Sequence, residues 1–194
     1  MEFIAHRINT IEELKKVPSE YGVELDLRDY GDKLILQHDP FIGGEEFEEY
    51  LKHYHHGTMI LNIKSERIEY RVLELLSKYK IENYFFLDSS FPMIYLLSKS
   101  FEKNIALRFS EIEGLDTIIA MSEKVKWIWV DCFTKLPINK EIYSKLRSFN
   151  FKLCLVSPDL QGQENRIEEY RDFLIENKLI MDAVCVKSNN VRRW

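Results

Sequence analysis

Residues Phe3 to Pro40 include the segments FIAHRINT and GVELDLRDYGDKLILQHDP, which carry the most information about how this chain folds. In GVELDL, Glu24 and Asp26 alternate with apolar residues. Successive side chains of a strand point to opposite faces, so the two acids share one face and the apolar residues share the other. Hard cations such as Mg²⁺ and Ca²⁺ bind carboxylate oxygens, so this pair predicts a divalent-cation site.

The other two apolar runs of this stretch also end in polar groups. His6 and Arg7 follow the first run, and His38 follows the third. Histidine and arginine side chains are costly to place near a core unless a partner or a ligand satisfies them. The stretch therefore predicts a functional site as well as a sheet.

Composition limits what kind of protein this is. The 194 residues are enough for one well-buried core, and no Pro, Gly or Ser-rich linker divides them, so we expect a single domain over residues 1–194. Basic residues number 27 and acidic residues 32, interspersed along the chain, so no footprint for nucleic acid is visible. Cys132, Cys154 and Cys185 lie in apolar runs without zinc-site spacing, which indicates reduced, buried thiols.

The N-terminal residues MEFIAHRIN carry an acid at position 2 and reach a charged pair after a short apolar run. This is the pattern of neither a signal peptide nor a transmembrane segment. We therefore expect a cytoplasmic protein, and the sequence does not determine its oligomeric state.

Strands and helices alternate along the whole chain. The predicted strands are 3–8, 22–27, 34–37, 59–64, 84–87, 104–109, 126–131, 152–156 and 182–186, and the predicted helices are 11–17, 45–55, 66–79, 91–100, 114–122, 139–149 and 164–177. Alternation of this kind implies parallel strands joined by right-handed crossovers, and eight such steps close a barrel. We predict an α/β fold, a small or slightly irregular (β/α)8 TIM-type barrel with a hairpin and helix inserted after the second strand.

In a barrel, functional groups gather at the carboxyl ends of the strands. The ends of the later strands are unusually polar and include Asn62, Lys64, Arg108, Trp129 and Asp131. The mouth of the barrel would then hold acids for a metal and bases for an anion. A phosphate ester is the natural ligand, because metals and cationic side chains both stabilise charge on phosphoryl oxygens.

The runs IAHR, GVELDL, DKLILQHDP and LNIK together resemble the glycerophosphodiester phosphodiesterase family, a metal-dependent barrel whose pattern is HR, E-x-D, HD and E-x-K. The resemblance is strong over residues 3–64. It implies that His6 and His38 are the general acid and base and that Glu24 and Asp26 bind Mg²⁺, Ca²⁺ or Mn²⁺. It also implies that Arg7 and Lys64 contact the phosphate of a small phosphodiester substrate.

Two departures from the family pattern stand out. Ile8 occupies the position of the glycine that follows HR, and Asn62 replaces the glutamate of E-x-K. An asparagine carbonyl still coordinates a hard cation, so Asn62 is the third expected ligand of a weakened site. The later strands RFSEIE, WIWVDCF and LVSPDL are similar to a branch of the family that has NIK in place of E-x-K.

Several polar residues also have purely structural interpretations. His53, His55 and His56 at a helix end are better explained as ordinary structural histidines, although such a cluster can bind metal adventitiously. Asp88 and Asp131 fit helix N-caps about as well as site residues, and Trp127 and Trp129 can simply fill the barrel. Arg108 fits either a charged rim residue or a contact to a second anionic part of the substrate.

Two functions therefore remain open. The first is a metal-dependent phosphodiester hydrolase that acts on a glycerophosphodiester-like or related small phosphodiester. The second is a catalytically impaired barrel that binds a phosphodiester or another phosphate-containing ligand in a polymer or lipid pathway, which Asn62 favours. Neither requires nucleic acid or a membrane span.

Overall fold

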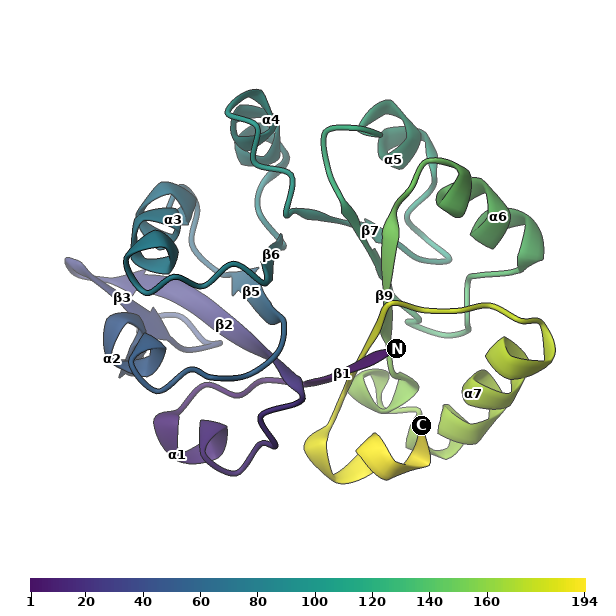
Figure 1. The fold of residues 1–194 in the computed structure, drawn as a ribbon, viewed down its shortest axis with the longest axis horizontal. Helices are drawn as coiled ribbons and strands as arrows, with labels where there is room; N and C mark the ends of the chain where they lie inside the picture. Colours follow the sequence, from purple (N-terminus) through teal and green to yellow (C-terminus); the bar gives the residue numbers. More distant parts are fainter.

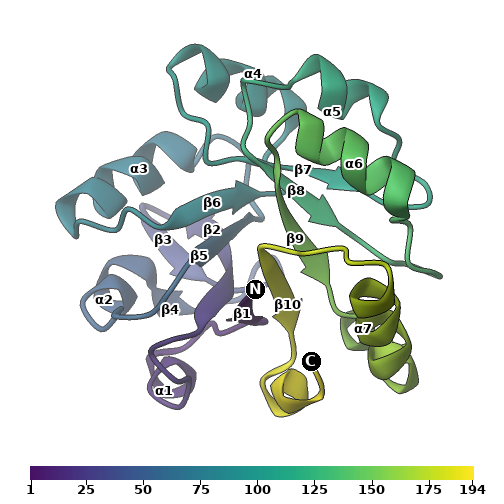
Figure 2. The same ribbon diagram turned by 45° about the vertical axis from the view of Figure 1, so that its right-hand side comes forward.

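The computed structural model describes residues 1–194 as an α/β fold in which helices surround a curled sheet (Figures 1 and 2). The parallel strands are β1 (Glu2–Ala5), β2 (Gly22–Tyr30), β5 (Met59–Ile63), β6 (Tyr84–Leu87), β7 (Ala106–Phe109), β8 (Trp127–Val130), β9 (Lys152–Val156) and β10 (Ala183–Val186). The helices are α1 (Ile11–Leu14), α2 (Phe47–Leu51), α3 (Glu69–Lys78), α4 (Phe91–Lys99), α5 (Asp116–Ala120), α6 (Lys140–Ser148) and α7 (Ile167–Glu176). Short 3₁₀ turns are η1 (Pro158–Gln161), η2 (Glu164–Arg166) and η3 (Ser188–Arg193).

The parallel ladders follow the order β7-β8-β9-β10-β1-β2-β5-β6. Between β6 and β7 there is only one isolated bridge, Phe86 to Ile105, which includes a hydrogen bond from the Phe86 N–H to the carbonyl of Asn104 at 2.9 Å. The α/β class and the alternation agree with the sequence prediction. The closed barrel is not shown, because the ring of ladders is interrupted at this β6–β7 seam.

The insertion after the second strand is present. β3 (Lys33–Leu36) pairs antiparallel with β2, and β4 (Glu45–Glu46) pairs antiparallel with β3. The predicted helix over 45–55 is therefore wrong at both ends: Glu45 and Glu46 are in a strand, and the helix covers only Phe47–Leu51. Its apolar residues Phe47, Tyr50 and Leu51 are nonetheless buried as the periodicity requires.

The first predicted strand, 3–8, also ends earlier than expected. β1 stops at Ala5, and Arg7 adopts a positive φ of 56°. The chain then enters α1 through a capping box in which Thr10 and Glu13 exchange hydrogen bonds. The predicted helix over 11–17 is shortened to Ile11–Leu14.

Two apolar layers fix where the site lies. One cluster lies inside the curl of the sheet and includes Ile60, Phe85, Trp127 and Cys154, and a larger one lies between the strands and the outer helices. Phe85 and Trp127 stack inside the curl with ring centroids 4.5 Å apart. The three cysteines are buried and unbonded, as predicted. This filling leaves only the carboxyl ends of the strands open to polar groups.

None of the helices is both long enough and apolar enough to cross a membrane.

Candidate active site

The two acids of β2 point into the curl of the sheet, as the alternation predicts. Glu24 and Asp26 are almost completely buried, at 1% and 0% exposure. Arg7 turns its main chain toward them through its positive φ, and its N–H donates a hydrogen bond to Glu24 Oε2 at 2.8 Å. The guanidinium of the same residue lies 3.3 Å from Asp26 Oδ2. One residue thus stabilises both carboxylates, one through its backbone and one through its side chain.

Asn9 is a site residue that the sequence reasoning missed. Its Nδ2 donates to Asp26 Oδ2 at 2.9 Å, and its Oδ1 accepts from the Asp26 N–H at 2.8 Å. This reciprocal pair fixes the carboxylate of Asp26 in one orientation.

Asn62 lies on β5 in register with Asp26 of β2. Its Nδ2 donates to Glu24 Oε1 at 2.8 Å, so its carbonyl Oδ1 faces elsewhere and has no hydrogen-bond partner although it is buried. Asp26 Oδ1 is likewise buried without a hydrogen bond, although Lys64 Nζ lies 3.5 Å from it as an ion-pair partner. Buried acceptors without donors are costly, and a cation with oxygen ligands would satisfy both.

The residues present therefore fit a divalent cation held by carboxylate and amide oxygens. No group of three or more His, Cys, Asp or Glu side chains comes together as a metal site, and the expected set of Glu24, Asp26 and Asn62 contains only two acids. Glu24 accepts hydrogen bonds from Asn62 and Arg7 on its two oxygens, so a cation would compete with these donors. These residues therefore fit a divalent cation that is bound weakly.

The electrostatics of this pocket are set by burial. Burial raises the pKa of Glu24 to about 7, and the neighbouring charge of Asp26 adds to this increase, whereas hydrogen bonds from Asn62 and Arg7 oppose it. Burial also lowers the pKa of His6 to about 4, helped by the charge of Arg7. His6 Nε2 lies 3.6 Å from Glu24 Oε2, but this contact is no ion pair at neutral pH, because the imidazole is uncharged.

His38 follows β3 in the inserted hairpin. Its Nδ1 lies 2.8 Å from Asp39 Oδ1, and this hydrogen bond lowers the pKa of Asp39. Arg28 of β2 holds the backbone of the same loop, with hydrogen bonds to the carbonyls of Gln37 at 3.1 Å and His38 at 2.9 Å. His38 is more exposed than His6: the exposed fractions of the two side chains are 41% and 24%.

A second set of charged residues crosses the mouth beyond Glu24 and Asp26. Lys64 Nζ lies between Asp26 Oδ1, at 3.5 Å, and Asp88 Oδ2, at 3.7 Å. Arg108 binds both carboxylate oxygens of Asp88, at 2.6 and 2.9 Å, and also Asp131 Oδ2 at 2.6 Å. Although burial lowers the pKa of Arg108, hydrogen bonding to Asp88 and the charges of both aspartates raise it overall.

The three remaining predicted site residues, Arg108, Trp129 and Asp131, belong to one network of side-chain contacts. Asp131 and Trp129 belong to the network that surrounds Arg108: the Trp129 indole donates to Asp131 Oδ2 at 3.3 Å, and Gln161 donates to Asp131 Oδ1 at 2.8 Å. Gln161, from η1, was not predicted. No N-terminal helix cap by Asp131 is present, since α6 is capped by Asn139.

Nearly all predicted site residues line one cavity of about 220 Å³ at the carboxyl ends of the strands. These are His6, Arg7, Glu24, His38, Asn62, Lys64, Arg108, Trp129 and Asp131, together with Asp88 and Gln161. Asp26 does not line the cavity but touches it through Arg7 and Lys64. The residues His53, His55 and His56 lie elsewhere, and His56 Nε2 contacts the carbonyl of Val17 at 3.0 Å, consistent with a structural role.

Asp159 is a further buried acid that the sequence reasoning missed. It is 0% exposed, and its Oδ2 accepts hydrogen bonds from the Lys187 N–H at 3.2 Å and from Asn190 Nδ2 at 2.8 Å. Its charge acts on His6 and opposes the decrease in that pKa. The loop that carries Asp159 is distant in sequence from His6, so no local pattern could link them.

Sequence comparisons find no match to this chain among protein-family models or among curated proteins. Solved structures do match it. A glycerophosphodiester phosphodiesterase from Agrobacterium tumefaciens str. C58 superimposes with a TM-score of 0.69 at 14% identity, over 95% of each chain. A second structure from that organism gives 0.66 at 13% identity, over 95% of this chain and 92% of that one.

A glycerophosphoryl diester phosphodiesterase from Parabacteroides distasonis ATCC 8503 gives a TM-score of 0.63 at 13% identity, over 95% of this chain and 81% of that one. The likeness agrees with the resemblance carried by the motifs of residues 3–64. The chain therefore has the fold of glycerophosphodiester phosphodiesterases.

Proposed function

We propose that this chain is a metal-dependent phosphodiester hydrolase that acts on a glycerophosphodiester-like or related small phosphodiester, with His6 and His38 as its general acid–base pair. The observation that carries the proposal is the common cavity, which collects His6, Glu24, His38 and Lys64 from separate segments. A packed fold needs none of these groups for stability, and their convergence in one polar cavity is what phosphoryl chemistry requires.

The metal part of the proposal rests on Glu24, Asp26 and Asn62. Their oxygens would hold Mg²⁺ or Ca²⁺, with Mn²⁺ as a further candidate, and the buried acceptors Asp26 Oδ1 and Asn62 Oδ1 support this assignment. When bound, such a cation supplies stabilisation of negative charge on the phosphoryl oxygens.

The two histidines differ in ways that suit opposite roles. His6 is uncharged at neutral pH because burial lowers its pKa, so it can accept a proton from the attacking nucleophile. His38 lines the cavity, and its Nδ1 hydrogen-bonds to the carboxylate of Asp39, which orients the ring so that Nε2 can donate a proton to the departing alcohol. Arg7 and Lys64 would contact the phosphoryl oxygens, since both line the cavity with cationic groups.

The far side of the cavity would contact the alcohol part of the substrate. Arg108, Trp129 and Asp131 line it, but Arg108 already binds two carboxylates. Its remaining N–H groups are available to a neutral hydroxyl more readily than its charge is available to a second anion. We therefore assign this side to recognition of a small polar alcohol.

The alternative function is a barrel that binds a phosphodiester or another phosphate-containing ligand without cleaving it. The amide of Asn62 favours it, because Asn62 donates a hydrogen bond to Glu24 where the family pattern has a third carboxylate. A site with fewer acids binds its cation less tightly.

Turnover of a substrate panel distinguishes the two functions. The panel comprises glycerophosphodiesters, lysophospholipids and nucleotide-linked diesters, each with Mg²⁺, Mn²⁺, Ca²⁺ or chelator, and the readout is release of an alcohol or phosphomonoester. His6→Ala and His38→Ala should each reduce turnover by about 10² to 10⁴. The double variant should cost little more than the worse single variant, because the two residues act as one unit.

His53→Ala is the matched control, because it removes an exposed histidine outside the cavity. It should leave turnover unchanged. If the folded, metal-supplemented protein cleaves nothing while binding a phosphodiester through Arg7 and Lys64, the binding function replaces the hydrolase. Cleavage that persists without both histidines would leave the reaction class correct and the mechanism wrong.

A further inference from the structure

The helical layer has a gap beside the last strand. Each of the other parallel strands leads to an α-helix on the outside of the sheet, whereas β10 leads only to the 3₁₀ turn η3. The gap lies between α7 and the neighbouring strands β10 and β1 (Figures 1 and 2). The four residues of β10 are nonetheless buried, so the apolar surface that stays exposed lies before the amino end of this strand, at residues such as Ile180.

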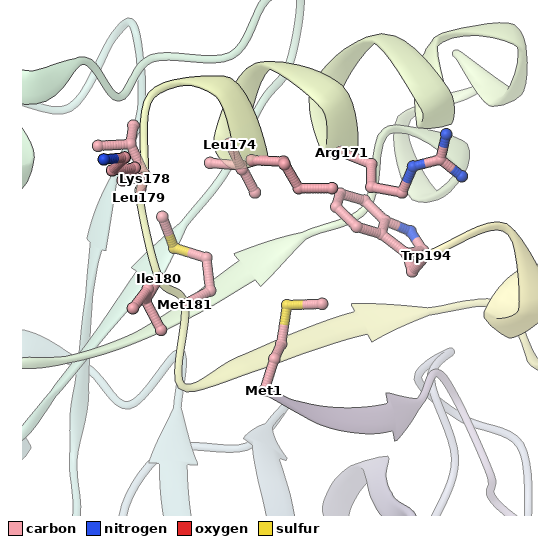
Figure 3. A pocket seen from close by; sticks show the side chains of 9 residues that line it. Met1, Arg171, Leu174, Lys178, Leu179, Ile180, Met181 and Trp194 are labelled. Atoms are coloured by element: carbon pink, nitrogen blue, oxygen red, sulfur yellow. The ribbon is translucent and has the colours of Figure 1, made fainter.

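An apolar groove with a volume of about 460 Å³ lies here, between α7 and the residues that precede β1 and β10 (Figure 3). Leu174 of α7 forms one wall, Met1 and Met181 form the floor and the Trp194 ring closes one side (Figure 3). Ile180 extends the apolar surface and is 68% exposed. A cavity of this size and character is in the range that binds small organic molecules.

The groove is separate from the candidate active site. The two cavities share no lining residue. Met181 precedes β10, and Met1 precedes β1, so the groove lies at the amino ends of the strands, whereas the active-site cavity lies at their carboxyl ends. An occupant of the groove would therefore not compete directly with a phosphodiester.

The charged side chains that line the groove are all basic. The only charged side chains that line it are those of Arg171 and Lys178, which lie at opposite ends of it (Figure 3). Arg171 is partly satisfied by Asp172 at 2.8 Å and by the carbonyl of Arg193 at 2.8 Å. Lys178 is exposed and forms no ion pair. An apolar slot that ends in an unpaired ammonium group is complementary to a chain with a single anionic head.

We propose that this groove binds a free fatty acid, with the acyl chain against Leu174, Met181 and Trp194 and the carboxylate at Lys178. The acyl chain would cover the exposed apolar lining of the groove, and the head would stay at the rim, where it remains partly hydrated. A folded partner or a second copy of the chain would also cover apolar surface, but would not require a single acidic head next to Lys178.

Trp194 provides the measurement, because Trp127 and Trp129 are buried inside the sheet whereas Trp194 lines the groove. The full chain is titrated with 12-bromododecanoate below its micelle concentration while indole fluorescence is followed. We expect saturable quenching of the Trp194 contribution. Unbrominated octanoate, decanoate and dodecanoate should displace the probe with affinity rising about fourfold per buried methylene. Dodecylamine, of equal chain length and opposite charge, should displace it at least about tenfold more weakly.

Lys178→Glu tests the head contact, and Lys80→Glu is its matched control. Both lysines follow a helix with the same left-handed φ of 56°, so the backbone cost of the two substitutions is equal. Lys178→Glu should weaken dodecanoate binding and strengthen dodecylamine binding, and Lys80→Glu should change neither. Ile180→Glu, at an exposed position, should weaken binding of every chain length without unfolding the protein.

Three results would overturn the proposal. One is an absence of saturable quenching, and another is equal affinity for acid and amine of the same chain length. The third is self-association, measured by sedimentation at probe-free concentrations, that is abolished by Ile180→Glu while the fatty acids have no effect, which would assign the groove to a second copy.

Discussion

Arg108 and Asp88 form a two-pronged ion pair across the β6–β7 seam, where the backbone ladder is reduced to one bridge. Arg108 lies in β7 and Asp88 directly follows β6, and their contacts are 2.6 and 2.9 Å long. Elsewhere, neighbouring strands are joined by ladders such as Met59 to Asn62 of β5 against β6. At the carboxyl ends of the strands, a side-chain pair therefore replaces the missing backbone pairing.

Asp88→Asn should destabilise the protein by about 2 kcal/mol, because it leaves the partly buried guanidinium with one carboxylate fewer. Asparagine tolerates the left-handed φ of 60° at this position, so the substitution tests the charge and not the backbone. Urea unfolding measures the loss. The control Glu12→Gln removes the acid of the exposed Glu12–Lys16 pair and should change stability little. Equal effects of the two variants would show that the Asp88–Arg108 pair does not stabilise the β6–β7 seam.

The pH dependence of stability should reveal two opposing groups in the metal-free protein. The pKa of Glu24 rises from 4.5 to about 7, so its contribution is present below pH 4.5 and is lost as pH rises to 7. The pKa of His6 falls from 6.5 to about 4, so its contribution is present above pH 6.5 and is lost as pH falls to 4. The two changes are of similar size and nearly cancel.

Glu24→Gln removes the titrating carboxyl group, so that only the contribution of His6 to the pH dependence remains. In chelator-containing buffer, the stability of the variant should rise by about 3 kcal/mol between pH 4 and pH 6.5, through His6 alone, relative to wild type. Urea unfolding at each pH gives the comparison, and Glu20→Gln on the exposed surface is the control. A wild-type pH profile in Glu24→Gln would contradict the assigned pKa of Glu24.

A divalent cation should stabilise the native state by about 1 to 3 kcal/mol at saturation, because it binds the folded site and not the unfolded chain. Thermal melts with Mg²⁺, Mn²⁺ and Ca²⁺ measure this change, and Glu24→Ala should abolish it. Unchanged melting temperatures across millimolar titrations of all three ions would exclude a metal site here.

Asn62→Glu should tighten cation binding, because it adds a carboxylate next to Glu24 and Asp26. Calorimetric titration of wild type and variant compares their affinities directly. Equal or weaker affinity in the variant would mean that the side chain at position 62 does not face the cation.

Phe101→Gly should stabilise the protein by about 1 kcal/mol. Phe101 follows α4 with a left-handed φ of 64° and is 87% exposed, so glycine relieves strain and removes little packing. Phe91→Gly at the start of the same helix, where φ is not left-handed, should instead lower stability by about 1 kcal/mol. Thermal melts of the two variants should therefore shift in opposite directions.

Local periodicity was enough to predict the inward-facing acids and most of the strands. Glu24 and Asp26 were placed correctly because the period of a strand is a property of neighbouring residues. Helix starts were harder: the predicted helices 66–79 and 164–177 end within one residue of α3 and α7 but begin three residues too early, because neither start carries a side-chain N-cap.

The partners of the site residues could not be predicted from local pattern. Asn9 contacts Asp26 across 17 positions, and Gln161 contacts Asp131 across 30. Such contacts depend on how loops fold over the end of the sheet. The interrupted ladder between β6 and β7 could not be predicted either, because the predicted strands 84–87 and 104–109 have ordinary apolar patterns.

The interruption between β6 and β7 also suggests where the chain could be circularly permuted. Met1 and Trp194 both line the same groove, so a short linker can join them (Figure 3). A circular permutant opened in the loop between α4 and β7 would then begin at β7 and finish at α4, the helix that follows β6. Its strands would run in chain order through β8, β9, β10, β1, β2, β5 and β6, so that no extended ladder would be cut. The molecule is in this sense an open eight-stranded ribbon whose natural break point lies in the middle of its sequence.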